Sequence, residues 1–248
     1  RMMAAQLLGG RREPVSVTAL EHMLRQDPAL GALGALWALQ QMGALSDEVA
    51  RSALRHSYPA VRMWAVRLLG DKYGANRGLG LPGSGAFGAR ELPDEIMGVL
   101  AGLARREPDA EVRSQIASTA RRLPAAQALS LVMELAGDEG GTTDRPVAGT
   151  GPVAAGGSRR EVDVADAYLP LLLWWVLEAH VTLDREAVVS MLHSASLWDL
   201  PMFQQHLLPR LMRRFALEGR RQDLLTNARL LRMAPTPAHT IPLMKGFE

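Results

Sequence analysis

The residues of this chain that most resemble a chemical motif are three glycines, Gly83, Gly85 and Gly88, spaced as in a dinucleotide-binding turn. Such a turn binds a pyrophosphate only between a β-strand and the start of a helix, with an acidic residue about 20 positions further on. The preceding residues 71–82 (DKYGANRGLGLP) do not have the pattern of a strand. We therefore interpret the three glycines as part of a glycine-rich loop.

The histidines and other reactive residue types do not have the spacing of a metal or catalytic site. None of the six histidines forms an HExxH motif or an i, i+4 pair. His180 and His193 could meet across a helical hairpin, although surface and helix-end histidines are the commoner case. The chain contains no cysteine and no GxSxG, P-loop or deaminase signature. We predict no catalytic, metal-binding or cofactor-binding residue in this segment.

The most strongly charged stretch is basic and runs from Arg210 to Arg232. It holds seven arginines and two acidic residues, a local net charge of +5, whereas the whole chain has a formal net charge of only +2. Helical spacing places Arg210, Arg213 and Arg214 on one face. Two interpretations stay open, a solvated helix flank and a surface for an anionic partner. Few aromatic residues accompany these arginines, so nucleic acid is not the partner we expect.

A pair of adjacent tryptophans, Trp174 and Trp175, lies in an apolar stretch. Neighbouring residues on a helix point in different directions, so at most one of the two can face the core squarely. Core packing is one interpretation, and an exposed tryptophan that anchors a partner is the other. Together with the basic stretch this gives a candidate partner surface, whose members are Arg210, Arg213, Arg214, Arg221, Arg229 and Trp175.

These residues belong to a pattern of paired amphipathic helices that repeats along the chain. Three copies begin at Pro28, Pro59 and Pro108, continue as an apolar run and end at a glycine or proline. The first two prolines are 31 residues apart and the next two 49, of which a glycine-rich insertion accounts for about 17. A period of about 20–50 residues made of paired helices is typical of an α-solenoid. We therefore predict an all-α fold, a right-handed α-solenoid of about five to six helical hairpins.

Glycine-rich and proline-rich stretches divide this predicted array. We expect repeats over residues 1–136 with an insertion at 74–90, a flexible insertion at 137–164, and further repeats over 165–233. Residues 234–248 read as a proline-rich tail or linker, or as the first turns of another repeat. The expected helices include Met2–Gly9, Pro59–Leu69 with Gly70 as its stop, and Ala165–Ala179.

Two dipeptides, Val61-Arg62 and Val112-Arg113, each follow a turn that contains proline or aspartate, and they resemble the HEAT repeat. In that family an arginine and an acidic turn residue of neighbouring repeats can form a ladder along the stack. The resemblance assigns Arg62 and Arg113 to this ladder, with Asp109 and Glu111 as the acids expected near Arg113. Pro28 is followed by ALGAL without an arginine, so we do not expect a continuous ladder.

A closer resemblance covers most of the chain. The strings GALWALQQMGAL, YPAVRMWAVRLLGD, EVRSQIASTARRLP, DAYLPLLLWWVLEAH and ARLLRMAP resemble, in this order, the HEAT-repeat segment of large exported proteins of planctomycetes and their relatives. That family implies a sugar-dehydrogenase-like β-propeller before the segment, a c-type-cytochrome-like haem domain after it, and a periplasmic or exported location. The chain opens at Arg1 with helix periodicity already under way, and we interpret it as a fragment.

The resemblance predicts a non-catalytic scaffold that needs no cofactor of its own. Its partners would be the redox domains of the same polypeptide or another protein. The alternatives are a stand-alone HEAT-like adaptor and a HEAT-like enzyme of the bilin-lyase or DNA-glycosylase type. The longest apolar run, Leu169–Leu177, is too short to span a bilayer.

Overall fold

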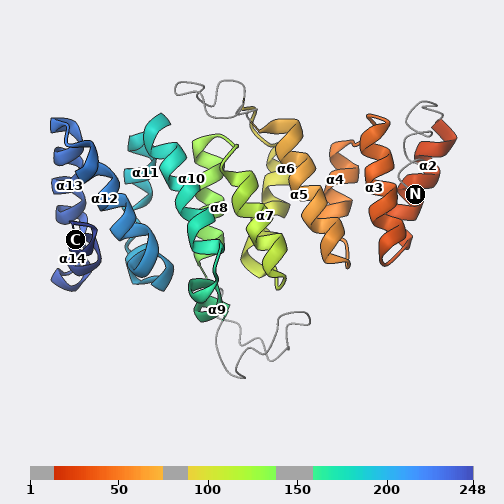
Figure 1. The fold of residues 1–248 in the computed structure, drawn as a ribbon. Coiled ribbons are helices and arrows are strands. Elements are labelled where there is room, and N and C mark those ends of the chain that lie inside the picture. Colours follow the sequence, from red (N-terminus) through yellow and green to blue (C-terminus); the bar gives the residue numbers. More distant parts are fainter. Residues whose placement is uncertain (1–13, 75–88, 138–158, 248) are drawn as a thin grey trace.

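The computed structural model describes residues 14–74, 89–137 and 159–247, and over these residues the fold is all-α, as predicted. Thirteen α-helices stand side by side in an elongated row, with no strand among the described residues (Figure 1). The expected helix Met2–Gly9 and the glycine motif at 83–88 lie outside the described residues. The elements are α2 (Pro14–Gln26), α3 (Leu30–Gln41), α4 (Asp47–Leu54), α5 (Pro59–Tyr73), α6 (Asp94–Arg106), α7 (Ala110–Ala120), α8 (Ala125–Ala136), α9 (Arg159–Ala165), α10 (Leu169–Leu183), α11 (Arg185–Met191), the 3-10 turn η1 (Ala195–Asp199), the π-turn η2 (Phe203–Leu207), α12 (Leu208–Glu218), α13 (Arg221–Met233), α14 (Pro237–Met244) and the 3-10 turn η3 (Lys245–Phe247).

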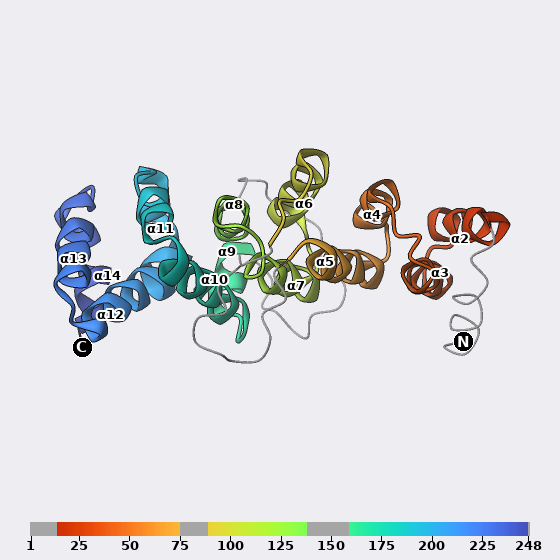
Figure 2. The same cartoon turned by 90° about the horizontal axis from the view of Figure 1, so that it is seen from above.

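Successive helices alternate between two layers (Figure 2). Layer 1 contains α2, α4, α6, α8, α11 and α13, and layer 2 contains α3, α5, α7, α10 and α12. Each helix packs on its neighbours in the same layer, so that α6 contacts α4 and α8, and α7 contacts α5 and α10. The row of helical hairpins is compatible with the predicted solenoid.

The two long edges of the row carry different connections. We call the edge where the chain turns from layer 1 to layer 2 the hairpin edge, and the opposite one the return edge. The short helix α9 lies on the hairpin edge, at the bottom of Figure 1. The distinction matters because the buried ion pairs of Arg62 and Arg113 described below lie on the hairpin edge.

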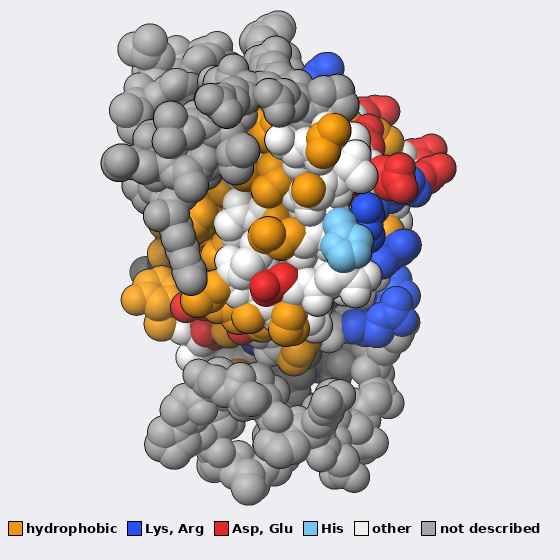
Figure 3. All heavy atoms as spheres, turned by 90° about the vertical axis from the view of Figure 1, so that its right-hand side faces the viewer, with side chains coloured by type: hydrophobic (Ala, Val, Ile, Leu, Met, Phe, Trp, Pro, Cys, Tyr) orange, Lys and Arg blue, Asp and Glu red, His pale blue; other side chains and the backbone are white. Residues whose placement is uncertain are grey.

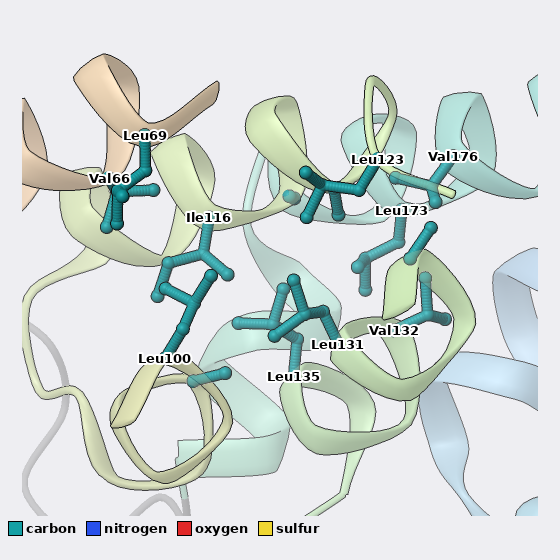
Figure 4. Packing of buried hydrophobic residues seen from close by; sticks show 14 of the residues in the cluster. Val66, Leu69, Leu100, Ile116, Leu123, Leu131, Val132, Leu135, Leu173 and Val176 are labelled. Atoms are coloured by element: carbon teal, nitrogen blue, oxygen red, sulfur yellow. The ribbon is translucent and has the colours of Figure 1, made fainter. Parts of the chain in front are cut away.

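Apolar side chains from both layers form one continuous core. Leu100 of α6, Ile116 of α7 and Leu131 of α8 are fully buried and point towards each other between the layers (Figure 4). In α7, Val112, Ile116 and the small Ala120 recur at helical spacing and are all fully buried. This periodic stripe gives the segment one apolar face, which is buried when α7 packs against its neighbours.

Helix α5 does not end at Gly70, as the sequence suggested, but continues to Tyr73. Gly70 is buried, and a Cβ atom there would lie 2.3 Å from the Arg122 guanidinium and 2.8 Å from a methyl carbon of Thr119. The Thr119 hydroxyl also donates to the Val66 carbonyl oxygen at 3.3 Å. The glycine therefore allows close approach of α5 and the end of α7, a packing role instead of a helix stop.

The expected helix Ala165–Ala179 corresponds to α10, which begins four residues later, at Leu169, and continues to Leu183. Ala165 is instead the last residue of α9, and Pro170 lies in the first turn of α10. The Asp166 carboxylate accepts hydrogen bonds from the Tyr168 and Leu169 backbone N–H groups at 2.8 and 2.7 Å, which fixes the turn between the helices. Because α9 starts at residue 159, the last part of the insertion predicted at 137–164 is helical.

The tail also differs from a linker. Residues Pro237–Met244 form α14, which packs on α12, and Leu243 is fully buried. Proline is compatible with the start of a helix because of its fixed φ and absent N–H. Of the two expectations for this segment, a linker and the start of another repeat, the helix fits the second. The C-terminal segment is therefore part of the folded array.

Candidate interaction surface

Two buried arginines join successive turns on the hairpin edge. The Nε and Nη2 atoms of Arg62 donate to the two carboxylate oxygens of Glu107 at 2.8 and 2.6 Å. Nη2 of Arg113 donates to Asp163 at 2.6 Å. All four side chains are nearly inaccessible, the most exposed being Arg62 with 11%. We call these two pairs the arginine ladder.

Each arginine of the ladder also holds its own turn in the same way. Nη1 of Arg62 donates to the carbonyl oxygens of His56 and Ser57 at 2.8 and 2.9 Å. Nη1 of Arg113 donates to the carbonyl oxygens of Glu107 and Pro108 at 3.0 and 2.8 Å. One guanidinium thus satisfies two turn carbonyls and one carboxylate of the next turn, which makes these hairpins structurally equivalent.

Asp109, which the sequence pattern assigned to the ladder, has a different role. Its carboxylate accepts from the Glu111 and Val112 backbone N–H groups at 3.0 and 3.1 Å and caps α7. The acid paired with Arg113 is instead Asp163, fifty residues further along the chain. Sequence spacing could not identify this residue, because a glycine-rich stretch separates it from the repeats.

We predict that Asp109→Ala lowers the free energy of unfolding by about 1 kcal/mol, because it removes the cap of α7. Asp109→Asn keeps an oxygen that accepts the same hydrogen bonds. The free energy of unfolding of this variant is therefore expected to stay within roughly a few tenths of a kcal/mol of that of the parent. Urea unfolding followed by circular dichroism measures both values. A loss as large for the asparagine variant as for the alanine variant would show that the charge, as in a ladder acid, is what matters.

On the hairpin edge, a histidine contact takes the place of an arginine in the turn before that of Arg62. Gly31 of α3 stands 31 residues before Arg62 and has no side chain to bridge to the next turn. Instead, His56 Nε2 lies 3.0 Å from the carbonyl oxygen of Asp27, and His56 Nδ1 accepts from the Tyr58 N–H at 3.0 Å. A carbonyl oxygen only accepts, so Nε2 is the protonated nitrogen and donates to Asp27.

At the other end of the ladder, a histidine again takes the place of an arginine. Leu169 follows Asp163 by six residues, as Arg113 follows Glu107, but its side chain cannot donate a hydrogen bond. Here His206 Nε2 donates to the carbonyl oxygen of Val164 at 3.0 Å. The end of α9 is therefore held on both sides, by Arg113 at residue 163 and by His206 at residue 164.

The stability of the array is expected to fall as the pH is lowered through the range where histidine titrates. Burial lowers the pKa of His206 below its ordinary value; the hydrogen bond to Val164 acts against this shift and the Arg210 guanidinium adds to it. The unfolded chain then binds the proton at higher pH than the folded chain, so stability drops below the ordinary histidine pKa until the folded pKa is passed. Unfolding midpoints measured across this range should vary less in His206→Gln. An unchanged pH dependence in that variant would contradict the assignment.

Helix α10 carries an exposed apolar strip. Tyr168, Leu171 and Trp175 follow each other at helical spacing and are 71%, 36% and 39% exposed. The adjacent Trp174 is 9% exposed and belongs to the core. The start of α10, where the strip begins, is fixed by the hydrogen bonds to Asp166. The preceding helix α9 is held by Arg113 and His206. Of the residues predicted for the partner surface, Trp175 therefore lies on a rigid, accessible helix.

The predicted arginines form a surface that is partly neutralised within the protein. Arg214 pairs with Glu218, whose pKa this hydrogen bond and charge lower, and Arg229 of α13 donates to Glu186 of α11 at 2.6 Å. Arg210 and Arg213 donate to backbone carbonyl oxygens, of His206 at 3.2 Å and of Gly246 at 3.4 Å. Arg221 is exposed at the start of α13. The arginines lie on α12 and α13 and Trp175 lies on α10, so the predicted residues occupy different helices.

A third buried ion pair was missed by sequence reasoning. Arg185 of α11 pairs with Asp223 of α13, whose side chain is 1% exposed. The Arg185 guanidinium also lies 5.2 Å from the centroid of the buried Phe215 ring, a distance at which a cation and an aromatic face attract. Asp223 stands in a stretch counted as basic, and its partner on another helix could not be deduced from spacing.

Between α4 and α7, the return edge is held by exposed pairs. Lys72 Nζ and the Tyr73 hydroxyl donate to the Asp47 carboxylate at 2.7 and 2.8 Å, and these two hydrogen bonds lower the pKa of Asp47. Arg122 pairs with Asp71 at 2.7 Å. The carboxylates of both pairs are more than 40% exposed, in contrast to those of the arginine ladder.

A polar hollow of about 570 Å³ lies beside the first two turns of the hairpin edge, where Arg25, Arg51, Arg55 and His56 are among the lining residues. Two of its arginines are already paired, Arg25 with Glu21 and Arg51 with Glu95. Asp27 and Glu48 line it as well. Because both positively and negatively charged side chains line the hollow, it has no preference for an anionic ligand.

At the N-terminal end of the row, hydrophobic side chains gather over part of the face turned to the viewer in Figure 3. Val15 and Met23 of α2 are 80% and 46% exposed, and Leu30 at the start of α3 is 57% exposed. End helices of a stacked array have a neighbour on one side only, and this leaves such side chains accessible.

Over residues 14–74, 89–137 and 159–247, no group of three or more His, Asp or Glu side chains has a metal-binding arrangement. His180 is buried in α10 whereas His193 is exposed with Nδ1 3.1 Å from the Ser190 carbonyl oxygen, so the two do not share an environment. Within the same ranges, no helix has both the length and the apolar character needed to cross a bilayer. Comparisons with family models, curated proteins and solved structures give no significant match.

Proposed function

We propose that this chain is a non-catalytic scaffold that binds protein through the strip Tyr168, Leu171 and Trp175. The observation that carries the proposal is the exposure of three large apolar side chains in line on one rigid helix. Exposed tryptophan and tyrosine give a large contact area for little loss of side-chain entropy, and they are enriched among residues that dominate binding energy. The continuous two-layer core supports the strip independently of any partner.

We further propose, from the sequence resemblance, that the partners are redox domains. They would be a sugar-dehydrogenase-like β-propeller and a c-type-cytochrome-like haem domain of the same polypeptide, in a periplasmic or exported location. In this arrangement the helical array holds the two domains at a fixed separation. A long stack whose repeats contact only their neighbours is suited to this role.

Site-specific crosslinking of the native, full polypeptide tests the proposal. A photoreactive benzophenone residue replaces Trp175, and in a matched control it replaces the exposed Gly98 of layer 1. We expect crosslinks from position 175 to peptides of a propeller or haem domain, and a visible haem absorbance in the purified protein. Crosslinks to an unrelated polypeptide, in a protein without haem absorbance, would instead establish a stand-alone adaptor. A yield at position 175 no higher than at position 98 would overturn the interaction surface.

A further inference from the structure

Helix α13 turns its polar side inwards and an apolar stripe outwards. Its buried residues are Asp223, Thr226, Asn227 and Leu230, of which only the last is apolar. Asn227 is 4% exposed, and neither its amide nitrogen nor its oxygen has a hydrogen-bond partner among the described residues. The inward face is therefore poorly suited to be the main interface of an amphipathic helix.

The outward face of α13 has the composition of a helix interface. We define it by Arg221, Leu224, Leu225, Ala228 and Arg232, which helical spacing places together and which are all exposed. Leu224 and Leu225 are 51% and 55% exposed. The two leucines and the alanine form a narrow seam with one arginine at each end.

The position of α13 at the end of layer 1 indicates that its outward face fits another helix. Helix α6 is covered by α4 on one side and α8 on the other, and α8 is covered by α6 and α11. Helix α13 is the last of its layer, so its outward seam has no neighbour among the described residues (Figure 2). A seam one helix wide fits another helix, whereas binding to a lipid surface needs a broader apolar face inserted into the headgroup region.

The charges at the ends of the seam specify the partner further. Arg221 and Arg232 are eleven positions apart, about 16 Å at ~1.5 Å per residue. Neither pairs with a carboxylate among the described residues, unlike Arg214 and Arg229. A complementary helix would present carboxylates at this spacing and a leucine-rich seam between them.

We propose that the outward face of α13 is a docking surface for an acidic amphipathic helix. The inference rests on the proposed scaffold function, but it concerns a different face from that of Trp175. The array would then hold two partners, one on α10 and one at the end of layer 1. The partner helix continues the layer in the way that α6 and α8 continue it for α4.

Peptide binding to the full chain tests this docking surface. The probe is a fluorescent amphipathic peptide of about five turns, with a leucine seam and two glutamates eleven positions apart. A second peptide has lysines in place of the glutamates. We expect fluorescence anisotropy to show at least about tenfold tighter binding of the acidic peptide. Arg221→Glu/Arg232→Glu should reverse the preference, and Leu224→Gln/Leu225→Gln should weaken both peptides.

The controls separate this surface from general charge and from the α10 strip. Arg106→Glu/Arg121→Glu makes the same charge change at two exposed arginines outside α13 and should leave the preference intact. Trp175→Ala should also leave it intact, so a failed crosslinking experiment at position 175 is distinguishable from a failure here. Because the changed side chains are exposed, circular dichroism should confirm that every variant is folded. Equal binding of both peptides, equal loss in the control variant, or binding only to phosphatidylserine-containing vesicles would overturn the proposal.

Discussion

Replacing Arg113 by alanine is expected to lower the free energy of unfolding by about 3–5 kcal/mol, the typical cost of removing one partner from a buried ion pair. The variant takes away the guanidinium that compensates the buried Asp163 carboxylate. It also removes the donor that satisfies the carbonyl oxygens of Glu107 and Pro108. Guanidinium chloride unfolding, followed by circular dichroism, measures the change.

A matched exposed pair provides the control for this experiment. Arg229 and Glu186 lie at 2.6 Å, as close as Arg113 and Asp163, but their side chains are 38% and 69% exposed. Arg229→Ala should therefore cost less than about 1 kcal/mol. Arg113→Ala should also increase proteolysis near α9, because it releases a buried contact that helps to hold this helix. Equal losses in the two variants would show that the ladder contributes no more than a surface pair.

The second large effect is expected for Phe215→Ala, at about 3–5 kcal/mol. Phe215 is 1% exposed, so the substitution leaves a cavity beneath α12, and it removes the ring on which Arg185 lies at 5.2 Å. The Arg185–Asp223 pair is expected to lose part of its support, because the same ring holds the guanidinium in place.

Phe247→Ala is the control for the loss of a ring as such. Phe247 is 50% exposed, so its removal should cost about 1 kcal/mol or less. Thermal unfolding monitored by tryptophan fluorescence compares the two variants with the parent. If both shift the midpoint by the same amount, the packing between α11, α12 and α13 is looser than the structure indicates.

The helices were predictable where the pattern is local. The stripe Val112, Ile116 and Ala120 indicates one buried face, and Ser46, a residue type that favours helix starts, caps α4 by accepting from the Val49 N–H at 3.2 Å. Both signals involve residues within two or three turns of each other. Such signals do not depend on where the rest of the chain lies.

The sequence was least informative where the meaning of a residue depends on a distant partner. Gly70 has the appearance of a helix stop, and only the approach of Thr119 and Arg122 makes it a packing residue. Asp163 stands next to a glycine-rich stretch, and only the fold brings it to Arg113. Local patterns therefore gave the helices, but the contacts that lock one hairpin to the next could not be read from them.

The same difference between local patterns and contacts of distant residues applies to the candidate interaction surface. Trp175 was identified because adjacent tryptophans cannot both face the core squarely, whereas the pairing of Arg229 with Glu186 arises between helices α13 and α11. The strip residues Tyr168 and Leu171 were missed, although their spacing to Trp175 would have pointed to them once the start of α10 was known.

Between α4 and α9, the unequal burial of ion pairs on the two edges should make the array mechanically anisotropic. On the hairpin edge the carboxylates of Glu107 and Asp163 are shielded from solvent, whereas on the return edge those of Asp47 and Asp71 are in contact with it. Dissolved salt screens the exposed pairs far more than the buried ones. This part of the row should therefore flex like a strip hinged along its hairpin edge, and we expect its curvature to depend on ionic strength.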